Sequence, residues 1–342
     1  MLELTYKNHF RFGYNGVPWS SRADAGDHWF ADYGPCERAP LDFGSECVAT
    51  ARTIASQAEQ DIWVLFSGGI DSELVLRAFH AAGIRVRAAI LRFKHDLNVH
   101  DISYAVIACE SLGVHYRFFD LDLESFLASD AALALADETR CLSPQLLPTM
   151  WCMGEVPGYP VLGSGDCYLV RRAAIETVSG HWKYRFTDSV AETPGAWDLW
   201  EKEKIAAWYR YLLRYGKAGC AGFFQYTPEL MLAFLREPEI AVCVGTAQAC
   251  SSTPSKFPVY SRYFPLVARP KYNGYERALH IDQKFRPRFE EKHKAANSVY
   301  RTGYADLLRQ LAGYVRGPSS NMDERWFQRD RPPSTLSMTP VT

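Results

Sequence analysis

Six consecutive residues combine the side chains and the spacing needed to hold a phosphate group: Ser67, Gly68, Gly69, Ile70, Asp71 and Ser72. The two glycines let the backbone approach an anion closely, and the two serine hydroxyls can donate hydrogen bonds to it. Asp71 is the most informative of the six, because a carboxylate repels a phosphate unless a metal ion bridges the two. We therefore expect this loop to bind a phosphate together with Mg²⁺, with Asp71 as a metal ligand.

Two other phosphate-binding loops do not fit this segment. The GxxxxGK[ST] loop requires a lysine immediately before its Ser or Thr, whereas Ile70 and Asp71 precede Ser72, and no GxGxxG pattern occurs here. An ordinary surface turn is disfavoured by the flanking sequence. Residues 62–66 form a short apolar run typical of a strand, and residues 73–82 have helical periodicity. A helix that begins in this way directs unpaired N–H groups and the positive end of its dipole toward an anion.

Alternating strand and helix patterns surround the loop. Strands are predicted over 85–93 and 114–120, with a helix over 98–112 between them that Asn98 is placed to cap. A helical pattern over 44–58 leads into the first strand. Strands joined by short helical connections predict an α/β fold built on a doubly wound, Rossmann-like parallel sheet. Ligands of such sheets bind beyond the carboxyl ends of the strands, which is where the loop lies.

Changes of pattern along the chain predict four regions. They are an irregular, aromatic-rich lead-in, an α/β domain that contains the loop, a mostly helical lobe, and a polar, mobile tail rich in Pro and Ser. Their bounds are 1–43, 44–170, 171–316 and 317–342.

The composition is that of a folded globular protein. Its 342 residues are 47% hydrophobic and 14% aromatic, which is enough for a large core. A net charge of -1 provides no overall attraction to nucleic acid or to an anionic membrane. The 9 cysteines include no CxxC pair, so we expect reduced thiols and no zinc cluster. Without a recognisable signal peptide or membrane span, the sequence predicts a soluble cytoplasmic protein.

With its preceding strand, the SGGxDS pattern of the loop resembles the fingerprint of the PP-loop ATP pyrophosphatases. Within that superfamily the chain is most similar to the synthetase domain of asparagine synthetases and their relatives, the β-lactam synthetases. LGSGDC at 162–167 is similar to the GEGxDE turn of that family. Residues 227–276 contain TPELMLAFL and SKFPVYSRYFPLVARPKYNGYE, which resemble the family's later helix and its closing lysine pattern.

This resemblance implies an AMP-forming ligase that uses ATP and Mg²⁺. Such an enzyme would adenylate a substrate oxygen from a carboxylate or an amide, release pyrophosphate, and let ammonia or an amine displace AMP. By resemblance, the loop would hold the phosphates, Gly163 and Gly165 would belong to a second turn at the site, and Asp71 and Asp166 would bind Mg²⁺. For Asp166, an alternative is that the carboxylate only completes a tight turn.

Further roles are implied for residues outside the two turns. Leu91 and Arg92 occupy strand positions near which the family seats the adenine ring, chiefly through backbone groups. Lys256 or Lys271 would stabilise the departing pyrophosphate. Arg269 and Lys271 could reach the phosphates, with a plain surface pair as the alternative, and the alternative for Lys256 is a solvated side chain.

The sequence also departs from this family. Asparagine synthetases carry an N-terminal glutaminase domain whose nucleophile is the cysteine after the initiator Met, but residue 2 is Leu and too few residues precede the loop. Nitrogen would therefore come as free ammonia or an amine, with a separate glutaminase as one source. Ser164 stands where the family has Glu.

Two other functions remain open from the sequence. One is tRNA or nucleobase modification, including sulfur insertion, on the same loop; it calls for a basic surface and often for paired cysteines. The other is a nucleotide-binding protein that has lost turnover, which the departure at Ser164 keeps in consideration. The sequence indicates no oligomeric state.

Overall fold

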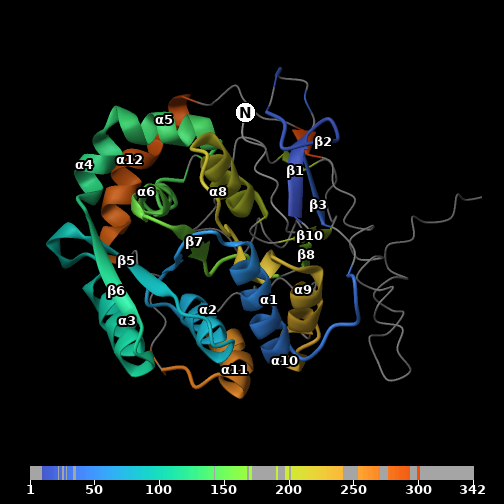
Figure 1. The fold of residues 1–342 in the computed structure, drawn as a ribbon. Coiled ribbons are helices and arrows are strands. Elements are labelled where there is room, and N and C mark those ends of the chain that lie inside the picture. The colour runs from blue at the N-terminus through green and yellow to red at the C-terminus, as the bar shows by residue number, and fades with distance from the viewer. Residues whose placement is uncertain are drawn as a thin grey trace, which may run out of the picture.

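A four-stranded parallel sheet forms the centre of the protein (Figure 1). The computed structural model describes residues 10–21, 23–24, 27, 29–33, 36–141, 143–167, 169–171, 190–191, 197–199, 202–241, 253–267, 269, 276–292 and 299–300. The strands of the central sheet lie in the order β6-β5-β4-β7, and their bounds are β4 Ile62–Leu65, β5 Arg87–Phe93, β6 His115–Leu121 and β7 Tyr159–Leu162.

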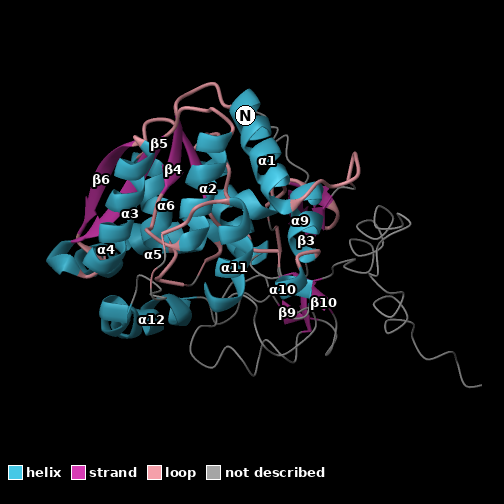
Figure 2. Ribbon diagram, turned by 90° about the horizontal axis from the view of Figure 1, so that it is seen from below, coloured by secondary structure: helices cyan, strands magenta, loops and turns pink. Residues whose placement is uncertain are grey.

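Helices cover both faces of this sheet (Figures 1 and 2). On one face lie α1 Phe43–Gln57, α2 Ile70–Ala81 and α3 Val99–Leu112. The other face carries α6 Leu147–Glu155, which packs on β5 and β6 and is followed outward by α5 Asp130–Thr139 and α8 Lys202–Arg214. Because both faces are covered, β4 (IWVL) and β7 (YPVL) are apolar and almost entirely buried. The predicted α/β fold with a doubly wound parallel sheet is confirmed.

The order of the strands places a switch point between β4 and β7. From β4 the chain moves outward to β5 and β6, and it then returns to the opposite side of β4 as β7. Val64 of β4 lies opposite Ala88 of β5 on one side and Val161 of β7 on the other. The carboxyl ends of β4 and β7 therefore flank the position at which open α/β sheets bind their ligands.

The later part of the chain is predominantly helical in its described residues. Besides α8 it contains α9 Pro228–Leu235, α10 Pro238–Ala241, α11 Thr253–Tyr263 and α12 Leu279–Lys292. The Trp- and Tyr-rich amphipathic pattern over 197–215 predicts a helix, but β10 Trp197–Leu199 pairs with β8 Leu169–Arg171, and α8 begins only at Lys202. Between β6 and α5, α4 Leu123–Ala128 contacts α12.

The N-terminal lead-in contains strands where irregular structure was expected. β1 Phe10–Tyr14 pairs antiparallel with β2 Val17–Pro18 and with β3 Trp29–Tyr33, and β11 Val299–Tyr300 and β9 Val190–Ala191 extend the same sheet. Two features explain the hairpin. Asn15 and Gly16 have φ of 52° and 78°, as a type I′ turn requires, and alternate residues of β1 bury aromatic rings. The four domain bounds stay predictions, and the tail at 317–342 and the strand expected at 181–187 lie outside the described residues.

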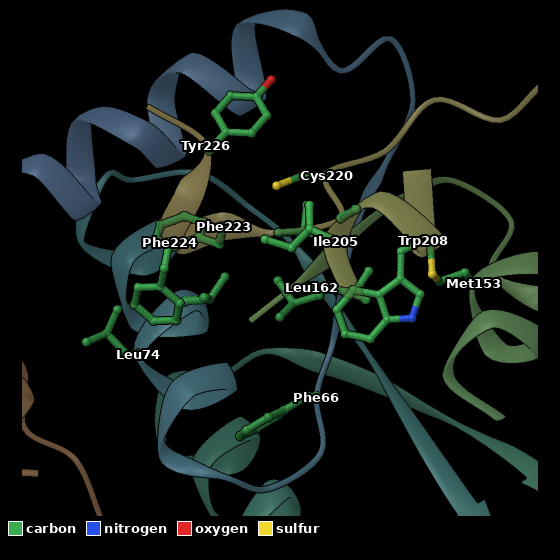
Figure 3. Close-up of a cluster of buried hydrophobic side chains, with 14 of the residues drawn as sticks. Phe66, Leu74, Met153, Leu162, Ile205, Trp208, Cys220, Phe223, Phe224 and Tyr226 are labelled. Atoms are coloured by element: carbon green, nitrogen blue, oxygen red, sulfur yellow. The ribbon is translucent and has the colours of Figure 1, made fainter. Parts of the chain in front are cut away.

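A hydrophobic core lies beneath the carboxyl ends of β4 and β7 (Figure 3). Its members come from the end of β4, from α2, β7 and α8, and from the segment between α8 and α9; they include Phe66, Leu74, Leu162, Ile205, Trp208, Phe223 and Phe224. The segment before α9 runs beside β7, where Leu162 N donates to Cys220 O at 2.9 Å and Cys220 N to Pro160 O at 2.8 Å. Residues from both halves of the chain thus pack beneath the edge of the sheet at which a ligand is expected.

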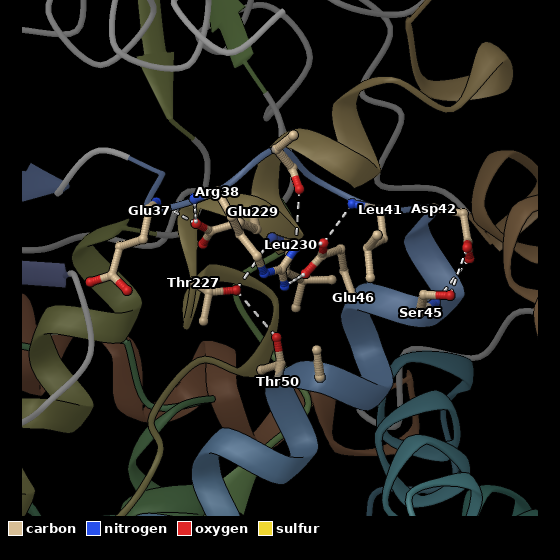
Figure 4. Close-up of polar contacts among 12 residues, drawn as sticks. Glu37, Arg38, Leu41, Asp42, Ser45, Glu46, Thr50, Thr227, Glu229 and Leu230 are labelled. Atoms are coloured by element: carbon tan, nitrogen blue, oxygen red, sulfur yellow. Dashed lines mark hydrogen bonds and ion pairs between the residues drawn. The ribbon is translucent and has the colours of Figure 1, made fainter.

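Buried carboxylates attach the segment before α1 to the rest of the protein (Figure 4). Glu229 of α9 accepts from the backbone N–H groups of Glu37 and Arg38, at 2.6 and 3.3 Å. Glu46 of α1 accepts from the Leu41 N–H at 2.7 Å and from the Arg38 guanidinium. Charge-assisted hydrogen bonds of this kind fix the start of α1, whose first residue, Phe43, stacks on Tyr260.

Candidate functional site

The glycine-rich loop connects β4 directly to α2. Phe66 still belongs to the sheet, since its N–H donates to Ala89 O at 2.8 Å, and Gly69 is the N-cap of α2. Within the described residues no side chain caps α2, so its first-turn N–H groups point toward the open edge of the sheet. The hydroxyls of Ser67 and Ser72 lie 3.1 Å apart across the loop, and Ser67 Oγ also accepts from Gly69 N at 3.3 Å. The sequence therefore folds here into the strand, loop and helix that it predicted.

Gly68 is the residue of this loop that no other type can replace without movement. Its φ is +86°, in the left-handed region, and a Cβ at this position would lie 2.0 Å from the carbonyl oxygen of Asp101. That carbonyl belongs to the first turn of α3. The loop is thus packed against the next helix.

The second glycine turn packs against the first, backbone to backbone. A Cβ on Gly163, which directly follows β7, would lie 2.7 Å from Ser72 Cα. Gly165 has φ of +90°, and a Cβ there would lie 2.8 Å from Ile205 in the core. These contacts bring Asp166 to the loop although 95 residues separate it from Asp71 in the sequence. Ser164 contributes a backbone contact, its carbonyl accepting from Phe224 N at 3.2 Å.

Lys256 joins the two acidic residues. It lies on α11, and its Nζ donates to both carboxylate oxygens of Asp71 at 2.6 Å and to Asp166 Oδ2 at 2.8 Å. The Lys256 side chain is only 4% exposed, so this ammonium is a buried cation held by two carboxylates. The structure thus brings together Asp71, Asp166 and Lys256, three of the four residues predicted to act in catalysis. The fourth, Lys271, lies outside the described residues.

The charge of Lys256 is set by two opposing effects. Burial alone would lower the pKa of its ammonium, but the carboxylates of Asp166 and Asp71 outweigh burial and raise the pKa above its ordinary value. Lys256 is therefore protonated at neutral pH. One positive charge then faces two negative ones, which leaves the group with a net negative charge beside the phosphate-type loop.

Tyr260, which the sequence analysis did not select, completes this group. Its hydroxyl donates to Asp71 Oδ1 at 2.8 Å. The ring of Tyr260 stacks on those of Phe43 and Phe224, each with a centroid separation of 5.8 Å. The one feature of the sequence that could have identified Tyr260 is its spacing from Lys256, because residues four positions apart lie on the same face of a helix. The sequence does not show what this face of the helix contacts, so Tyr260 could not be told apart from a core residue.

Arg269 is bound to the loop and to the first turn of α2. It forms an ion pair with the buried carboxylate of Glu73 and donates to the Gly68 carbonyl oxygen. Glu73 is also bound by Arg77, whose Nε lies 2.7 Å from Glu73 Oε1, and by the Val267 N–H at 3.2 Å. Burial lowers the pKa of Arg269 to about 10, which leaves it charged at neutral pH. The exposed surface pair considered for Arg269 is therefore wrong, because its side chain is only 4% exposed, and contact with phosphate stays a prediction.

The carboxyl end of β5, expected near the adenine ring, is fixed by Asn98. The Asn98 side chain donates to Leu91 O at 2.9 Å and accepts from Phe93 N at 2.9 Å. Asn98 is the N-cap residue of α3 as expected, but its side chain makes no capping hydrogen bond because it is used on β5. Arg92 extends outward and pairs with Asp120 at 2.5 Å. A role of Leu91 and Arg92 in holding adenine stays a prediction, limited to backbone groups.

The two carboxylates fit the requirements of a small, hard cation. Both converge on a single point within 2.8 Å, and that point is already occupied by a positive group, the Lys256 ammonium. Within the described residues no cluster of three or more His, Cys, Asp or Glu is present. Mg²⁺ in nucleotide sites commonly takes one or two carboxylates and completes its ligands with phosphates and water. Asp71 and Asp166 are therefore suitable for Mg²⁺ bound together with a nucleotide.

Comparisons with known proteins complete the description. No protein-family model matches the chain, and no curated protein matches it by sequence. The solved structures that are similar to it include two synthetases, both with low TM-scores. NMN synthetase from Francisella tularensis has a TM-score of 0.30 and 18% identity over 73% of this chain and 94% of its own. An NH3-dependent NAD synthetase from Campylobacter jejuni, solved with a nitrate ion, has a TM-score of 0.31 and 12% identity over 74% and 94%. None of the described helices has the length and hydrophobicity needed to cross a lipid bilayer.

Proposed function

We propose that this protein is an ATP-dependent, AMP-forming ligase of the PP-loop type, which joins ammonia or an amine to an adenylated substrate. The observation that carries the proposal is the convergence of Asp71, Asp166 and Lys256 beside the N-terminus of α2. Acidic residues within a phosphate-binding loop make chemical sense when a metal ion accompanies the phosphate. A buried lysine at the same point can neutralise charge on a leaving group.

In this proposal the loop binds the β and γ phosphates of ATP. The first-turn N–H groups of α2 and the hydroxyls of Ser67 and Ser72 donate hydrogen bonds to phosphate oxygens. Asp71 and Asp166 would hold Mg²⁺, which offsets the negative charge of the phosphates when it is bound. Gly68 lets the loop pack on the first turn of α3, and Gly163 lets the two turns pack closely on each other. Most of the catalysis then comes from positioning and charge neutralisation.

The reaction has two steps. A substrate oxygen, from a carboxylate or an amide, attacks the α phosphorus of ATP; a P–O bond forms, and the bond to the α–β bridging oxygen breaks. Pyrophosphate departs with Lys256 stabilising its negative charge. The nitrogen of ammonia or an amine then attacks the activated carbon, AMP leaves with the oxygen, and the nitrogen loses a proton. The source of the nitrogen would be free ammonia or a separate glutaminase.

Product analysis tests this function directly. Purified protein would be incubated with ATP, Mg²⁺, ammonium and a pool of amino acids and small carboxylates, and the nucleotides would be separated by ion-exchange chromatography. We expect AMP and pyrophosphate in equal amounts, and neither product with Asp71→Asn. Formation of ADP in place of AMP would contradict cleavage between the α and β phosphates.

Thermal protection separates loss of turnover from loss of binding. We expect Mg-ATP to raise the Tm of the protein and Asp71→Asn to abolish that shift, whether or not the acceptor is in the pool. Protection without AMP formation would favour a macromolecular acceptor or a nucleotide-binding protein without turnover. If Mg-ATP gave no protection, the proposed nucleotide site would be wrong.

A further inference from the structure

Lys256 occupies the point between the two carboxylates where a metal ion would bind. Its Nζ is the common partner of three carboxylate oxygens, at 2.6, 2.6 and 2.8 Å. We propose that Lys256 acts as an internal substitute for the metal ion, keeping free Mg²⁺ out of the nucleotide-free protein and leaving the carboxylates only when Mg²⁺ arrives with ATP. This inference rests on the proposed function, because it takes the site to bind Mg-ATP.

Electrostatic attraction holds the Lys256 ammonium between the two carboxylates. Asp71 and Asp166 would repel each other at this separation without a cation between them, and Asp166 and Lys256 are both buried. The ammonium removes this repulsion and satisfies the oxygens that a metal would need. A divalent cation cannot share the position with an ammonium, because two positive groups in contact in a partly desolvated site repel strongly. Free Mg²⁺ must therefore compete with a covalently attached cation that is always present.

Binding of ATP would change the partners that are available to Lys256. A triphosphate brings several negative charges to the loop, and these offer the Lys256 ammonium a new partner close to its present one. Moving the lysine does not require Asp71 to lose all of its contacts, because the Tyr260 hydroxyl still donates to Asp71 Oδ1. Lys256 and Tyr260 lie one helical turn apart on α11, so one helix carries the group that departs and the group that stays. Metal and nucleotide should thus bind with positive cooperativity.

Direct titration with Mn²⁺ tests this inference without measuring catalysis. Mn²⁺ prefers the same oxygen ligands as Mg²⁺, and electron paramagnetic resonance reports its free concentration. Wild-type protein, Lys256→Met and Lys284→Met would each be titrated with and without α,β-methylene-ATP. Lys284 is a matched control, because it also pairs with a carboxylate, Glu124, but is 60% exposed and belongs to α12.

Without nucleotide, we expect Lys256→Met to bind one Mn²⁺ at least tenfold more tightly than the wild type, because the competing cation is gone while both carboxylates remain. Lys284→Met should behave like the wild type. Adding Asp166→Asn to Lys256→Met should abolish the gain, which would assign the ion to this pair. With the ATP analogue the wild type should bind Mn²⁺ much more tightly than without it.

Equal Mn²⁺ affinity of the wild type and Lys256→Met in the absence of nucleotide would overturn the inference. So would tight binding of Mn²⁺ to the nucleotide-free wild type at Asp71 and Asp166. If Lys256→Met does not fold, as judged by circular dichroism, Lys256→Gln permits the same comparison, because it is neutral but keeps a hydrogen-bonding group. Failure of the proposed function would show itself differently, as absent AMP formation and absent protection by Mg-ATP in the wild type.

Discussion

At the scale of single residues, the site depends on one turn of α11. Lys256 supplies the cation and Tyr260 the hydroxyl, and both contact Asp71. Phe43 and Phe224 hold the tyrosine ring between them, so the hydroxyl has little freedom to leave the carboxylate. Tyr260, which the sequence pattern alone would assign to the core, therefore also orients the Asp71 carboxylate.

Replacing Tyr260 with Phe removes the hydroxyl and keeps the stacked rings. We expect the free energy of unfolding to fall by about 1–2 kcal/mol, because a hydrogen bond to a charged acceptor is lost. Turnover should also fall, by about tenfold, because Asp71 is no longer held in one orientation. Denaturant unfolding and the rate of pyrophosphate release measure the two effects.

Tyr263→Phe is the matched control for this change. Tyr263 is on the same helix, and its hydroxyl also donates to a carboxylate, Glu237 Oε1, at 2.7 Å. Its loss should cost similar stability without slowing turnover. Equal slowing by both variants would show that Tyr260 acts only through the stability of α11.

Gly68→Ala tests the packing beneath the loop. The added Cβ would lie 2.0 Å from the Asp101 carbonyl, so the loop must move, and we expect Mg-ATP to lose its effect on Tm. Gly83→Ala separates this clash from backbone strain, because Gly83 has a similar φ of +72° but nothing within 4 Å of an added Cβ. It should cost about 1 kcal/mol of stability and keep the response to Mg-ATP. Retained protection in Gly68→Ala would contradict the proposed loop geometry.

At the scale of elements, the segment after α11 fixes the loop through a buried carboxylate. Glu73 is fully buried in the first turn of α2 and is neutralised by Arg77 from one turn further on and by Arg269 from a distant segment. Arg269 also binds the Gly68 carbonyl. The chain from α11 to residue 269 is thus bound to the loop at two places: Lys256 contacts Asp71, and Arg269 contacts the Gly68 carbonyl.

A double-mutant cycle tests this connection. Arg269→Met should destabilise the protein by about 3–5 kcal/mol, because it leaves the charge of Glu73 incompletely neutralised. The double variant Glu73→Gln/Arg269→Met should lose clearly less stability than the sum of the single variants, since each change removes the partner that the other leaves unsatisfied. Urea denaturation would give the free energy of unfolding of the wild type, of both single variants and of the double variant. Additive losses would mean that the two side chains do not interact in solution.

Helices and strands with a clear repeating pattern of apolar residues were predictable from the sequence. Short strands that depend on pairing with other strands were not. The helix after the loop and the strands β5 and β6 were predicted within a few residues, because each has a clear apolar pattern. The hairpin of β1 and β2 was missed although Asn15-Gly16 is a strong turn signal. The apolar alternation before it is only five residues long, and the strand after it, β2, has only two residues.

For the site, the sequence predicted Asp71, Asp166 and Lys256 but not their contact. The spacing of side chains along a chain says nothing about which of them meet over 185 residues. The same limit explains Arg269, for which the sequence suggested a phosphate or the solvent as the partner and the structure shows Glu73.

At the scale of the whole molecule, the described cysteines are core residues. All seven of them are buried: Cys36, Cys47, Cys109, Cys141, Cys152, Cys167 and Cys220. Burial raises the pKa of their thiols, to about 12 for Cys152 as an example, so little reactive thiolate forms near pH 8. We expect at most two of the 9 thiols to react rapidly with DTNB in the native protein, and all 9 after denaturation in guanidinium. Rapid reaction of three or more would contradict this burial.

The long separation between Asp71 and Lys256 also matters while the chain is being made. During synthesis Asp71 and Asp166 leave the ribosome well before residue 256, so the growing protein carries an acidic pair whose internal counter-ion has not yet been added. Tyr260 and Arg269 arrive later still, and with them the contacts that fix the loop. The proposed nucleotide site can therefore be completed only after translation has passed residue 269, and a product terminated before residue 256 would lack all three of these contacts.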